Sequence, residues 1–111
     1  MRSDREKLED ILEAIQNIEK QAARGRAAFD GDELIRTYVV HHLQIIGEAT
    51  FKLSPEFRAR HPEIPWPKMM GMRHILVHDY FRVDLNIVWG VTQTDLPELK
   101  PKIETLLQSV K

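Results

Sequence analysis

The sequence predicts an all-α fold: an up-and-down four-helix bundle with additional short helices, formed as one domain over residues 1–111. Two observations favour this class. Apolar residues recur every three or four positions in several stretches, as they do on one face of a helix. No stretch of the sequence alternates apolar and polar residues in the manner of a β-strand. A chain of 111 residues is also long enough to bury a core without disulfides.

The first helix is expected to begin just after Ser3. Ser3 can cap it, and Glu6, three residues later, completes a capping box. Gly25 is expected to end it, because glycine is favoured just beyond a helix C-terminus. Between them, apolar residues recur at helical spacing and define the buried face: Leu8, Ile11, Leu12, Ile15, Ile18 and Ala22.

A loop through residues 29–31 is expected to lead to a second helix, capped by Asp30 or Asp32. His42 falls at the centre of its apolar face, which favours a core histidine hydrogen-bonded inside the bundle. Phe51 lies on the opposite side, close to Gly47, so the helix is either central or part of an association surface. The apolar face itself consists of Ile35, Tyr38, Ile45, Ile46, Ala49 and Leu53.

The residues that follow predict a short helix and then a rigid connection. Ser54 can cap the helix, Pro55 fits its first turn, and His61 precedes the proline that ends it. The segment 62–67 contains three prolines and is expected to be largely extended. Trp66 is expected to insert into the core.

Three further helices are predicted in the remainder of the chain. The third main helix is expected from about residue 67 to 81. Asp84 can cap a fourth segment, whose apolar residues recur from 85 to 92. Asp95, followed closely by a proline, predicts the start of a last helix.

Composition excludes several classes of function. The chain has no cysteine, so thiol catalysis, disulfides and thiolate-bound zinc are excluded. The first ten residues are rich in charge and do not read as a signal peptide, and no run approaches the roughly 18 apolar residues of a membrane span. We therefore expect a cytoplasmic protein that does not associate with membranes. The net charge of −1 gives no general signal for nucleic acid.

The candidate chemistry gathers between Arg73 and Tyr80, where an arginine, two histidines, a carboxylate and a phenol fall within just over two helical turns. On a regular helix Arg73 would lie in the middle of an apolar arc. A guanidinium there needs an acceptor, which can be a carboxylate, helix-end carbonyls or a ligand phosphate. A purely structural alternative is an internal salt bridge, or a side chain that extends to the surface.

His74 and His78 are four residues apart, and three interpretations of them stay open. They can ligate a metal, since this spacing is common in helical zinc sites, although the only further candidate ligand is His61. They can be ordinary exposed histidines. Alternatively, His78 can be a general base or acid, because imidazole titrates near neutral pH.

Cleavage of RNA without a metal requires a base, an acid and a cation near the phosphate, which histidine and arginine supply. Arg73 and His78 are five residues apart, hence ~140° apart around a regular helix. They do not converge easily on one phosphate from the same helix. Two antiparallel copies of this helix across a two-fold axis would bring both pairs to one cleft, so the spacing favours a homodimer.

The pattern Arg-x4-His-x-Tyr, formed by Arg73, His78 and Tyr80, resembles the signature of HEPN-domain proteins, in particular the HepT toxin group. The resemblance extends over essentially the whole chain. The other stretches that carry it are residues 8–12, 41–49, 61–66 and 83–85, together with Trp89.

This resemblance implies a HEPN-like helical homodimer that acts as a metal-independent endoribonuclease toxin without a cofactor. Arg73 would stabilise the phosphate and His78 would transfer protons, with His74 and Asp79 in supporting positions. Tyr80 would accept AMP from an MntA-like nucleotidyltransferase antitoxin. Two alternatives remain: a non-catalytic helical module that docks such a nucleotidyltransferase, and a metal-binding bundle.

Overall fold

The computed structural model describes residues 3–74 and 84–110. Every regular element in these two ranges is helical, which confirms the predicted all-α class. The elements are α1 (Asp4–Ala22), α2 (Arg26–Gly31), α3 (Glu33–Lys52), α4 (Pro55–Arg60), α5 (Trp66–Gly71), the 3₁₀ turn η1 (Met72–His74), α6 (Leu85–Gly90), the π-helical turn η2 (Val91–Asp95) and α7 (Leu96–Ser109).

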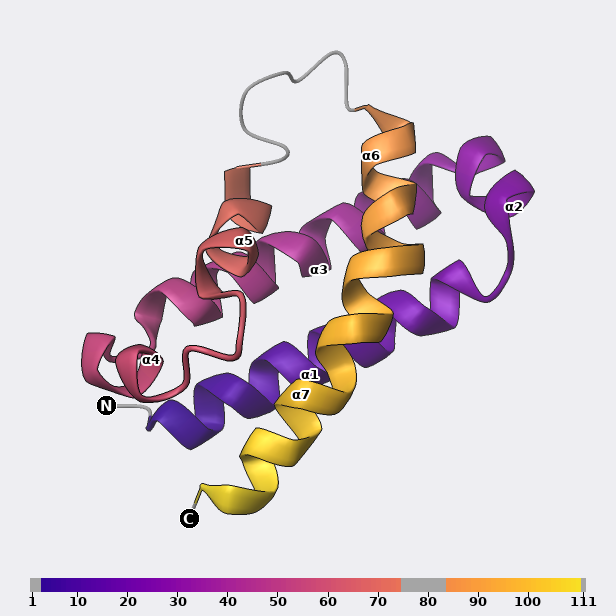
Figure 1. Cartoon of the computed structure of the whole chain (residues 1–111). Coiled ribbons are helices and arrows are strands. Elements are labelled where there is room, and N and C mark those ends of the chain that lie inside the picture. Colours follow the sequence, from indigo (N-terminus) through magenta and orange to yellow (C-terminus); the bar gives the residue numbers. More distant parts are fainter. Residues whose placement is uncertain (1–2, 75–83, 111) are drawn as a thin grey trace.

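The two longest helices, α1 and α3, lie side by side and run in opposite directions (Figure 1). Their register is set where α1 begins and α3 ends. The backbone N–H and hydroxyl of Ser54 both donate to the carboxylate of Asp4, at 3.0 and 2.9 Å. Lys7 donates to the carbonyl of Lys52 at 2.8 Å. These contacts tie the first turn of one helix to the end of the other.

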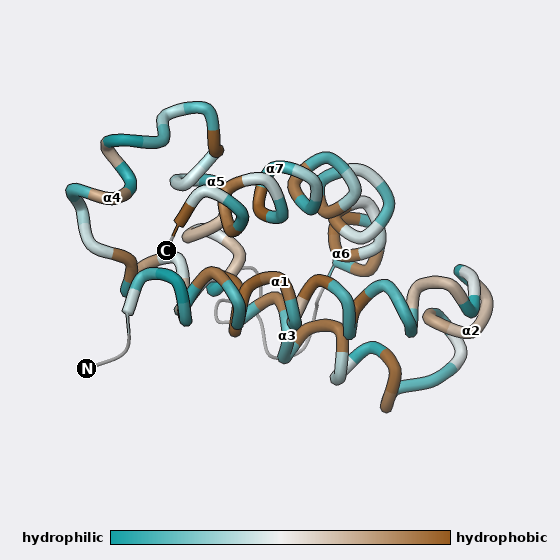
Figure 2. The backbone as a smooth tube through the Cα atoms, turned by 90° about the horizontal axis from the view of Figure 1, so that it is seen from below, coloured by the Kyte–Doolittle hydropathy of each residue, from teal (hydrophilic) through white to brown (hydrophobic). Residues whose placement is uncertain are grey.

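Helices α5, α6 and α7 form a second layer over this pair. Figure 2 shows α5, α6 and α7 on one side of α1 and α3. Arg5 of α1 donates to the carbonyls of Leu107 and Val110, so the end of α7 lies beside the beginning of α1. The four elements of the predicted bundle are thus α1, α3, the α5–η1 segment and the segment that runs from α6 through α7.

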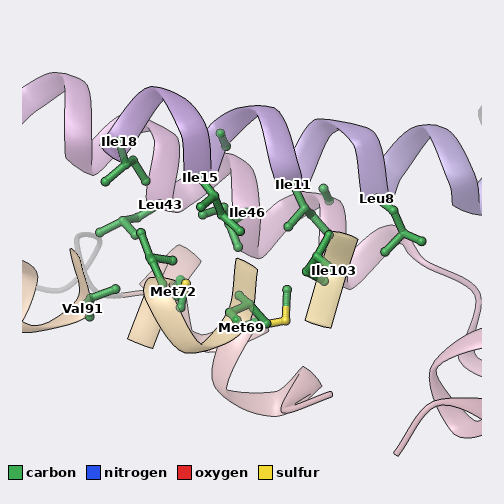
Figure 3. Close-up of a cluster of buried hydrophobic side chains, with 14 of the residues drawn as sticks. Leu8, Ile11, Ile15, Ile18, Leu43, Ile46, Met69, Met72, Val91 and Ile103 are labelled. Atoms are coloured by element: carbon green, nitrogen blue, oxygen red, sulfur yellow. The ribbon is translucent and has the colours of Figure 1, made fainter. Parts of the chain in front are cut away.

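The core fills the space between the two layers. Burial of these aliphatic side chains, roughly 25 cal/mol for each Å² removed from water, is the main force that holds the layers together. Figure 3 shows side chains from both layers pointing toward one another; those labelled are Leu8, Ile11, Ile15, Ile18, Leu43, Ile46, Met69, Met72, Val91 and Ile103.

The predicted start of the first helix is confirmed in detail. Ser3 accepts from the backbone N–H of Glu6, and the Glu6 carboxylate accepts from the N–H of Ser3, which completes the capping box. The helix ends at Ala22, slightly before the predicted stop. Gly25 has a φ of 96°, a conformation that costs other residues energy, and there the chain turns into α2.

The loop predicted through residues 29–31 is wrong, because these residues form the end of α2. The reason is tertiary packing. The ring of Phe29 is buried and lies 5.3 Å from the ring of Trp89, so burial outweighs the turn preference of the Asp30–Gly31 pair. Of the two predicted caps for α3, Asp32 is the one used, since its carboxylate accepts from the N–H of Leu34 at 2.9 Å.

His42 is buried, as predicted, and its Nδ1 lies 2.8 Å from the carbonyl oxygen of Tyr38. Tyr38 itself lies at the edge of the predicted apolar face and is 37% exposed. Val39 and Leu43, which the prediction left out, are buried instead. The buried stripe of α3 is therefore rotated slightly from the predicted one.

The short helix matches the prediction, but the expectation that residues 62–67 are largely extended is wrong. Pro62 and Glu63 form a turn closed by the N–H of Ile64 and the carbonyl of His61, and α5 already begins at Trp66. Ser54 caps α4 by accepting from Phe57, and the helix ends before His61. The Trp66 side chain is buried, and its indole N–H donates to the carbonyls of Arg58 and His61 at 3.0 and 2.9 Å. The tryptophan thereby fixes the end of α4 against the beginning of α5.

The predicted third main helix is confirmed only at its beginning. The described part consists of α5 and the tighter turn η1, and the rest of the predicted helix lies outside the described residues. A 3₁₀ turn has about three residues per turn, so the angular positions expected for a regular helix do not hold from Met72 to His74.

Asp84 caps α6 as predicted, by accepting from the N–H groups of Asn86 and Ile87. The cap predicted at Asp95 is wrong. The backbone at Asp95 is helical, so helix continues from α6 through the wider turn η2 into α7. The wider turn accommodates Pro97, which lacks a backbone N–H. Asp95 instead accepts from Lys68 at 2.9 Å and joins η2 to α5. None of the described helices is long and apolar enough to cross a membrane.

Candidate active site around Arg73

The backbone of η1 touches the backbone of α3 at Gly47. A Cβ atom on Gly47 would lie 2.5 Å from the backbone nitrogen of Arg73 and 2.7 Å from its Cβ. Real Cβ atoms essentially never approach so closely, so this contact requires a glycine. The approach fixes the start of the Arg73 side chain against the middle of α3.

The Arg73 side chain is 24% exposed and lies against two further residues of α3. Its Cζ atom is 3.9 Å from the centroid of the Phe51 ring, which is the geometry of a cation–π contact. Its Nη1 atom is 3.7 Å from Oε1 of Glu48. The acceptor predicted for this guanidinium therefore includes a carboxylate.

The pair between Arg73 and Glu48 is weak. At 3.7 Å the two atoms are too far apart for a good hydrogen bond, and the Glu48 side chain is 52% exposed to water. A phosphate oxygen with better geometry can therefore replace this carboxylate. Arg73 is placed to hold an anion without first breaking a strong internal bond.

His74 lies next to Arg73 at the end of η1 and on the surface. Its Nε2 atom accepts a hydrogen bond of 3.3 Å from Nε of Arg73. The structure thus brings together two of the predicted site residues. The other three, His78, Asp79 and Tyr80, lie outside the described residues.

Glu48 also lines an open groove of about 390 Å³ between α1 and α3. Lys7, His41 and Lys52 line it as well. Glu48 is therefore shared between this groove and Arg73, which is not among the residues that line the groove.

Glu48 and Phe51 were not predicted as site residues. The sequence placed Phe51 near Gly47 on the side of the helix away from the core, but nothing in the sequence linked either residue to Arg73. The only signal was an exposed aromatic side chain one helical turn from a glycine, which is too common to indicate a site on its own.

The sequence of this chain matches the family model described as "Ribonuclease HepT-like" over residues 11–106. The chain belongs to the HepT-like family. The match includes at least part of every described helix and contains the segment from Arg73 to Tyr80. It confirms the resemblance inferred from the Arg-x4-His-x-Tyr pattern.

Relatives within the HepT-like group match along most of their length. A protein of Thermococcus cleftensis named "Probable ribonuclease HepT" is 41% identical over 108 residues, which cover 95% of this chain and 96% of the relative. A protein of Caldanaerobacter subterraneus, provisionally named an RNase, is 36% identical over the whole of both chains. Another of Methanocaldococcus jannaschii, named in the same way, is 33% identical over 89% of this chain and 85% of its own length. No solved structure matches the chain significantly.

The metal site considered for this HepT-like chain would need His61 beside His74 and His78. Instead, Nδ1 of His61 lies 3.5 Å from a carboxylate oxygen of Glu63, and its ring packs against Phe57. Within residues 3–74 and 84–110, no three histidine or acidic side chains gather in a way that could hold a metal ion. His78 lies outside these ranges.

Proposed function

We propose that this protein is an endoribonuclease that cleaves RNA without a metal ion and acts as the toxin of a toxin–antitoxin pair. The observation that carries the proposal is the family match over residues 11–106, with relatives named as ribonucleases that align from end to end. The Arg-x4-His-x-Tyr pattern of Arg73, His78 and Tyr80 supplies the chemical groups. The position of Arg73 against α3, where it contacts Phe51 and Glu48, supports its role as an anion-binding residue.

The proposed reaction is an intramolecular transfer at phosphorus. His78 removes the proton from the 2′-hydroxyl, whose oxygen then attacks the neighbouring phosphorus. The bond from phosphorus to the 5′-oxygen breaks, and that oxygen takes a proton from a second group. The products are a 2′,3′-cyclic phosphate and a free 5′-hydroxyl.

Arg73 contributes by donating to the non-bridging phosphate oxygens, which gain negative charge as the transition state forms. Its guanidinium is planar and can give two parallel N–H bonds to a phosphate. The weakness of its pair with Glu48 supports this role, because a substrate phosphate can take the place of the carboxylate.

A homodimer completes this proposal. A base from one copy can pair with an arginine from the other across a two-fold axis. The same arrangement would supply a second His78 as the acid that protonates the leaving oxygen.

Regulation is proposed to act on Tyr80. An MntA-like nucleotidyltransferase would transfer AMP from ATP to the phenol oxygen with release of pyrophosphate. The attached nucleotide adds bulk and negative charge next to Arg73 and His78, so it competes with the phosphates of RNA for the same cations.

The first test is a cleavage assay on purified protein in EDTA. We expect RNA fragments that end in 2′,3′-cyclic phosphate, and loss of cleavage in the Arg73→Ala and His78→Ala variants. The matched control is His41→Ala, which removes an exposed histidine from α3. Cleavage that appears only when a divalent metal is added would rule out the mechanism.

The second test concerns the antitoxin. Incubation with an MntA-like nucleotidyltransferase and ATP should add the mass of AMP and stop cleavage. The chain contains two tyrosines, Tyr38 and Tyr80, so each serves as the control for the other. We expect Tyr80→Phe to block the mass gain and Tyr38→Phe to leave it intact. A complex that forms without any cleavage by the free protein would instead indicate the non-catalytic docking module.

A further inference from the structure

The aromatic ring of Phe51 holds the guanidinium of Arg73 by its flat face. The Cζ atom of Arg73 lies 3.9 Å above the ring centroid, which is close for a contact of this kind. The N–H bonds of a guanidinium point outward in its plane. A stack on one face therefore leaves the edge of the group able to donate to a ligand.

Two residues of α3 together fix this arrangement. Gly47 and Phe51 are four residues apart, so they lie one above the other on the same side of the helix. Gly47 receives the backbone of Arg73 in van der Waals contact, and the side chain then reaches Phe51 one turn away. The backbone contact with Gly47 fixes the position of the Arg73 Cα atom, and the contact with the Phe51 ring fixes the position of the guanidinium.

We propose that Phe51 is a positioning residue for Arg73 in RNA cleavage, an inference that rests on the proposed function. The ring keeps the guanidinium in one orientation both before and after a phosphate binds. Its contact uses the face of the group, whereas a phosphate uses the edge, so the two contacts do not compete. Pre-orientation of this kind reduces the reorganisation needed as the transition state forms.

Glu48 does not fill this role. Its carboxylate pairs with a guanidinium nitrogen, which is the same part of Arg73 that a phosphate requires. At 3.7 Å and half exposed, it makes a weak contact that the substrate displaces. Glu48 thus competes with the phosphate for Arg73, whereas the contact with the Phe51 ring remains when a phosphate binds.

Phe51 can be changed without damage to the core. It is 50% exposed and is not one of the buried residues that hold the two layers together. Leucine at this position keeps an apolar side chain of moderate size but has no aromatic face. Tyrosine and tryptophan keep the face. These three substitutions therefore separate the aromatic contact from simple packing.

The experiment measures kcat and KM for RNA cleavage in EDTA. We expect Phe51→Leu to lower kcat roughly 2- to 30-fold, the range that corresponds to the loss of one cation–π contact. Phe51→Tyr and Phe51→Trp should retain the wild-type rate, and KM should change less than kcat. The matched control is Tyr38→Leu, which removes an aromatic ring from the same helix where it packs on His42 and not on Arg73.

A second readout does not depend on catalysis. Because the guanidinium lies over the ring, the ring current should shift the Nε–Hε resonance of Arg73 in the NMR spectrum. Phe51→Leu should remove that shift, and Tyr38→Leu should leave it. A resonance that is the same in wild type and Phe51→Leu would overturn the contact itself.

The remaining outcomes separate this proposal from the proposed function. Wild-type protein that does not cleave RNA overturns the function, and the catalytic role of Phe51 with it. Active wild type with an equally active Phe51→Leu variant overturns only the role of Phe51. Because Glu48 competes with the phosphate for Arg73, Glu48→Gln should lower KM without lowering kcat, and a loss of kcat equal to that of Phe51→Leu would overturn the assignment of positioning to the ring.

Discussion

Gly47 and Arg73 are in backbone contact: a Cβ on the glycine would lie 2.5 Å from the arginine nitrogen. The contact joins the middle of α3 to the turn that begins the Arg-x4-His-x-Tyr pattern. Gly47 lies within a long helix, and the nearest atom of Arg73 belongs to the backbone and not to the end of a flexible side chain. A side chain at Gly47 can be accepted only if the turn that carries Arg73 moves.

Gly47→Ala is therefore expected to destabilise the protein and to lower its cleavage activity. Alanine normally stabilises a helix interior by about 0.5–1 kcal/mol relative to glycine. Here the overlap with Arg73 should reverse that gain, because overpacking at a tight contact costs about 1–3 kcal/mol. Urea denaturation measures the free energy of unfolding, and the EDTA cleavage assay measures activity.

The matched control is Gly90→Ala, at the end of α6. A Cβ there would meet no atom of the described residues within 4 Å. The backbone at Gly90 is already helical, so alanine should leave stability unchanged or raise it slightly. A Gly47→Ala variant as stable as Gly90→Ala would show that the turn adapts without strain.

Arg73→Lys is expected to abolish most cleavage although it keeps the positive charge. A lysine ammonium cannot give two parallel N–H bonds to a phosphate, and it lacks the flat face that lies over Phe51. Loss of one such donor lowers kcat roughly 10²- to 10³-fold in well-studied active sites. Single-turnover cleavage with excess enzyme measures this effect directly.

Arg24→Lys serves as the control for that substitution. Arg24 follows the C-terminus of α1, where it contacts Gln21 of the same helix and no residue of the candidate site. The same chemical change should leave cleavage unaffected there. If Arg73→Lys cleaves as fast as Arg24→Lys, only the charge of Arg73 matters and not its geometry.

The features of this fold that depend on neighbouring residues could be predicted from sequence. The caps at Ser3, Ser54 and Asp84 were predicted correctly. Each of these side chains accepts from a backbone N–H no more than three residues later in the chain. The burial of His42 was correct because helical spacing alone placed it on the apolar face. In both cases the interactions that determine the structure lie within one or two helical turns.

The wrong predictions concern segments whose conformation depends on contacts with residues far away in the sequence. Asp95 has the right residues around it for a cap, yet the helix passes through it and its carboxylate pairs instead with Lys68 of another element. Residues 29–31 have the composition of a turn, yet Phe29 is held in helix by its contact with Trp89. A local pattern does not include these contacts.

The candidate site was predictable only in part, for the same reason. The type and spacing of Arg73, His78 and Tyr80 could be read along the chain, and the family match supports that interpretation. The surroundings of Arg73 could not, because Glu48 and Phe51 come from a helix far earlier in the chain. Only the folded chain shows which carboxylate and which ring contact the arginine.

His42→Ala is expected to lower stability without affecting cleavage. The imidazole is buried, and its Nδ1 lies 2.8 Å from the carbonyl oxygen of Tyr38. Loss of its packing and hydrogen bond should cost about 1–3 kcal/mol. Thermal denaturation measures the cost, and cleavage is measured well below the lowered Tm. A folded variant that has lost activity would show that His42 takes part in catalysis.

Trp66→Phe is expected to destabilise the protein although both side chains are large and aromatic. The indole N–H bonds to the carbonyls of Arg58 and His61, and phenylalanine leaves both without this donor. Each carbonyl keeps a second donor, the backbone N–H of His61 for Arg58 and that of Ile64 for His61, so the expected cost is that of lost hydrogen bonds, about 0.5–1.5 kcal/mol each. Urea denaturation of the two proteins measures the difference. Equal stability would mean that water replaces the indole at the end of α4.

The pair between Lys100 and Glu19 should make stability depend on pH at the alkaline end. The Lys100 ammonium lies 2.8 Å from a Glu19 carboxylate oxygen and links α7 to α1. The hydrogen bond to Glu19 raises the pKa of Lys100 above its usual 10.5, with a smaller effect from the charge of Glu104. The folded protein thus holds this proton more tightly than the unfolded chain does.

The sign of the pH dependence follows from that shift. The stabilising contribution is fully present below the unfolded pKa of 10.5 and is lost as the pH rises through the higher folded value. A double-mutant cycle with Lys100→Met and Glu19→Gln isolates the coupling from other titrating groups. We expect a small favourable coupling at about pH 8 that disappears at strongly alkaline pH, provided the protein remains folded. A coupling that stays constant across this range would mean that the two helices are held by packing alone at this point.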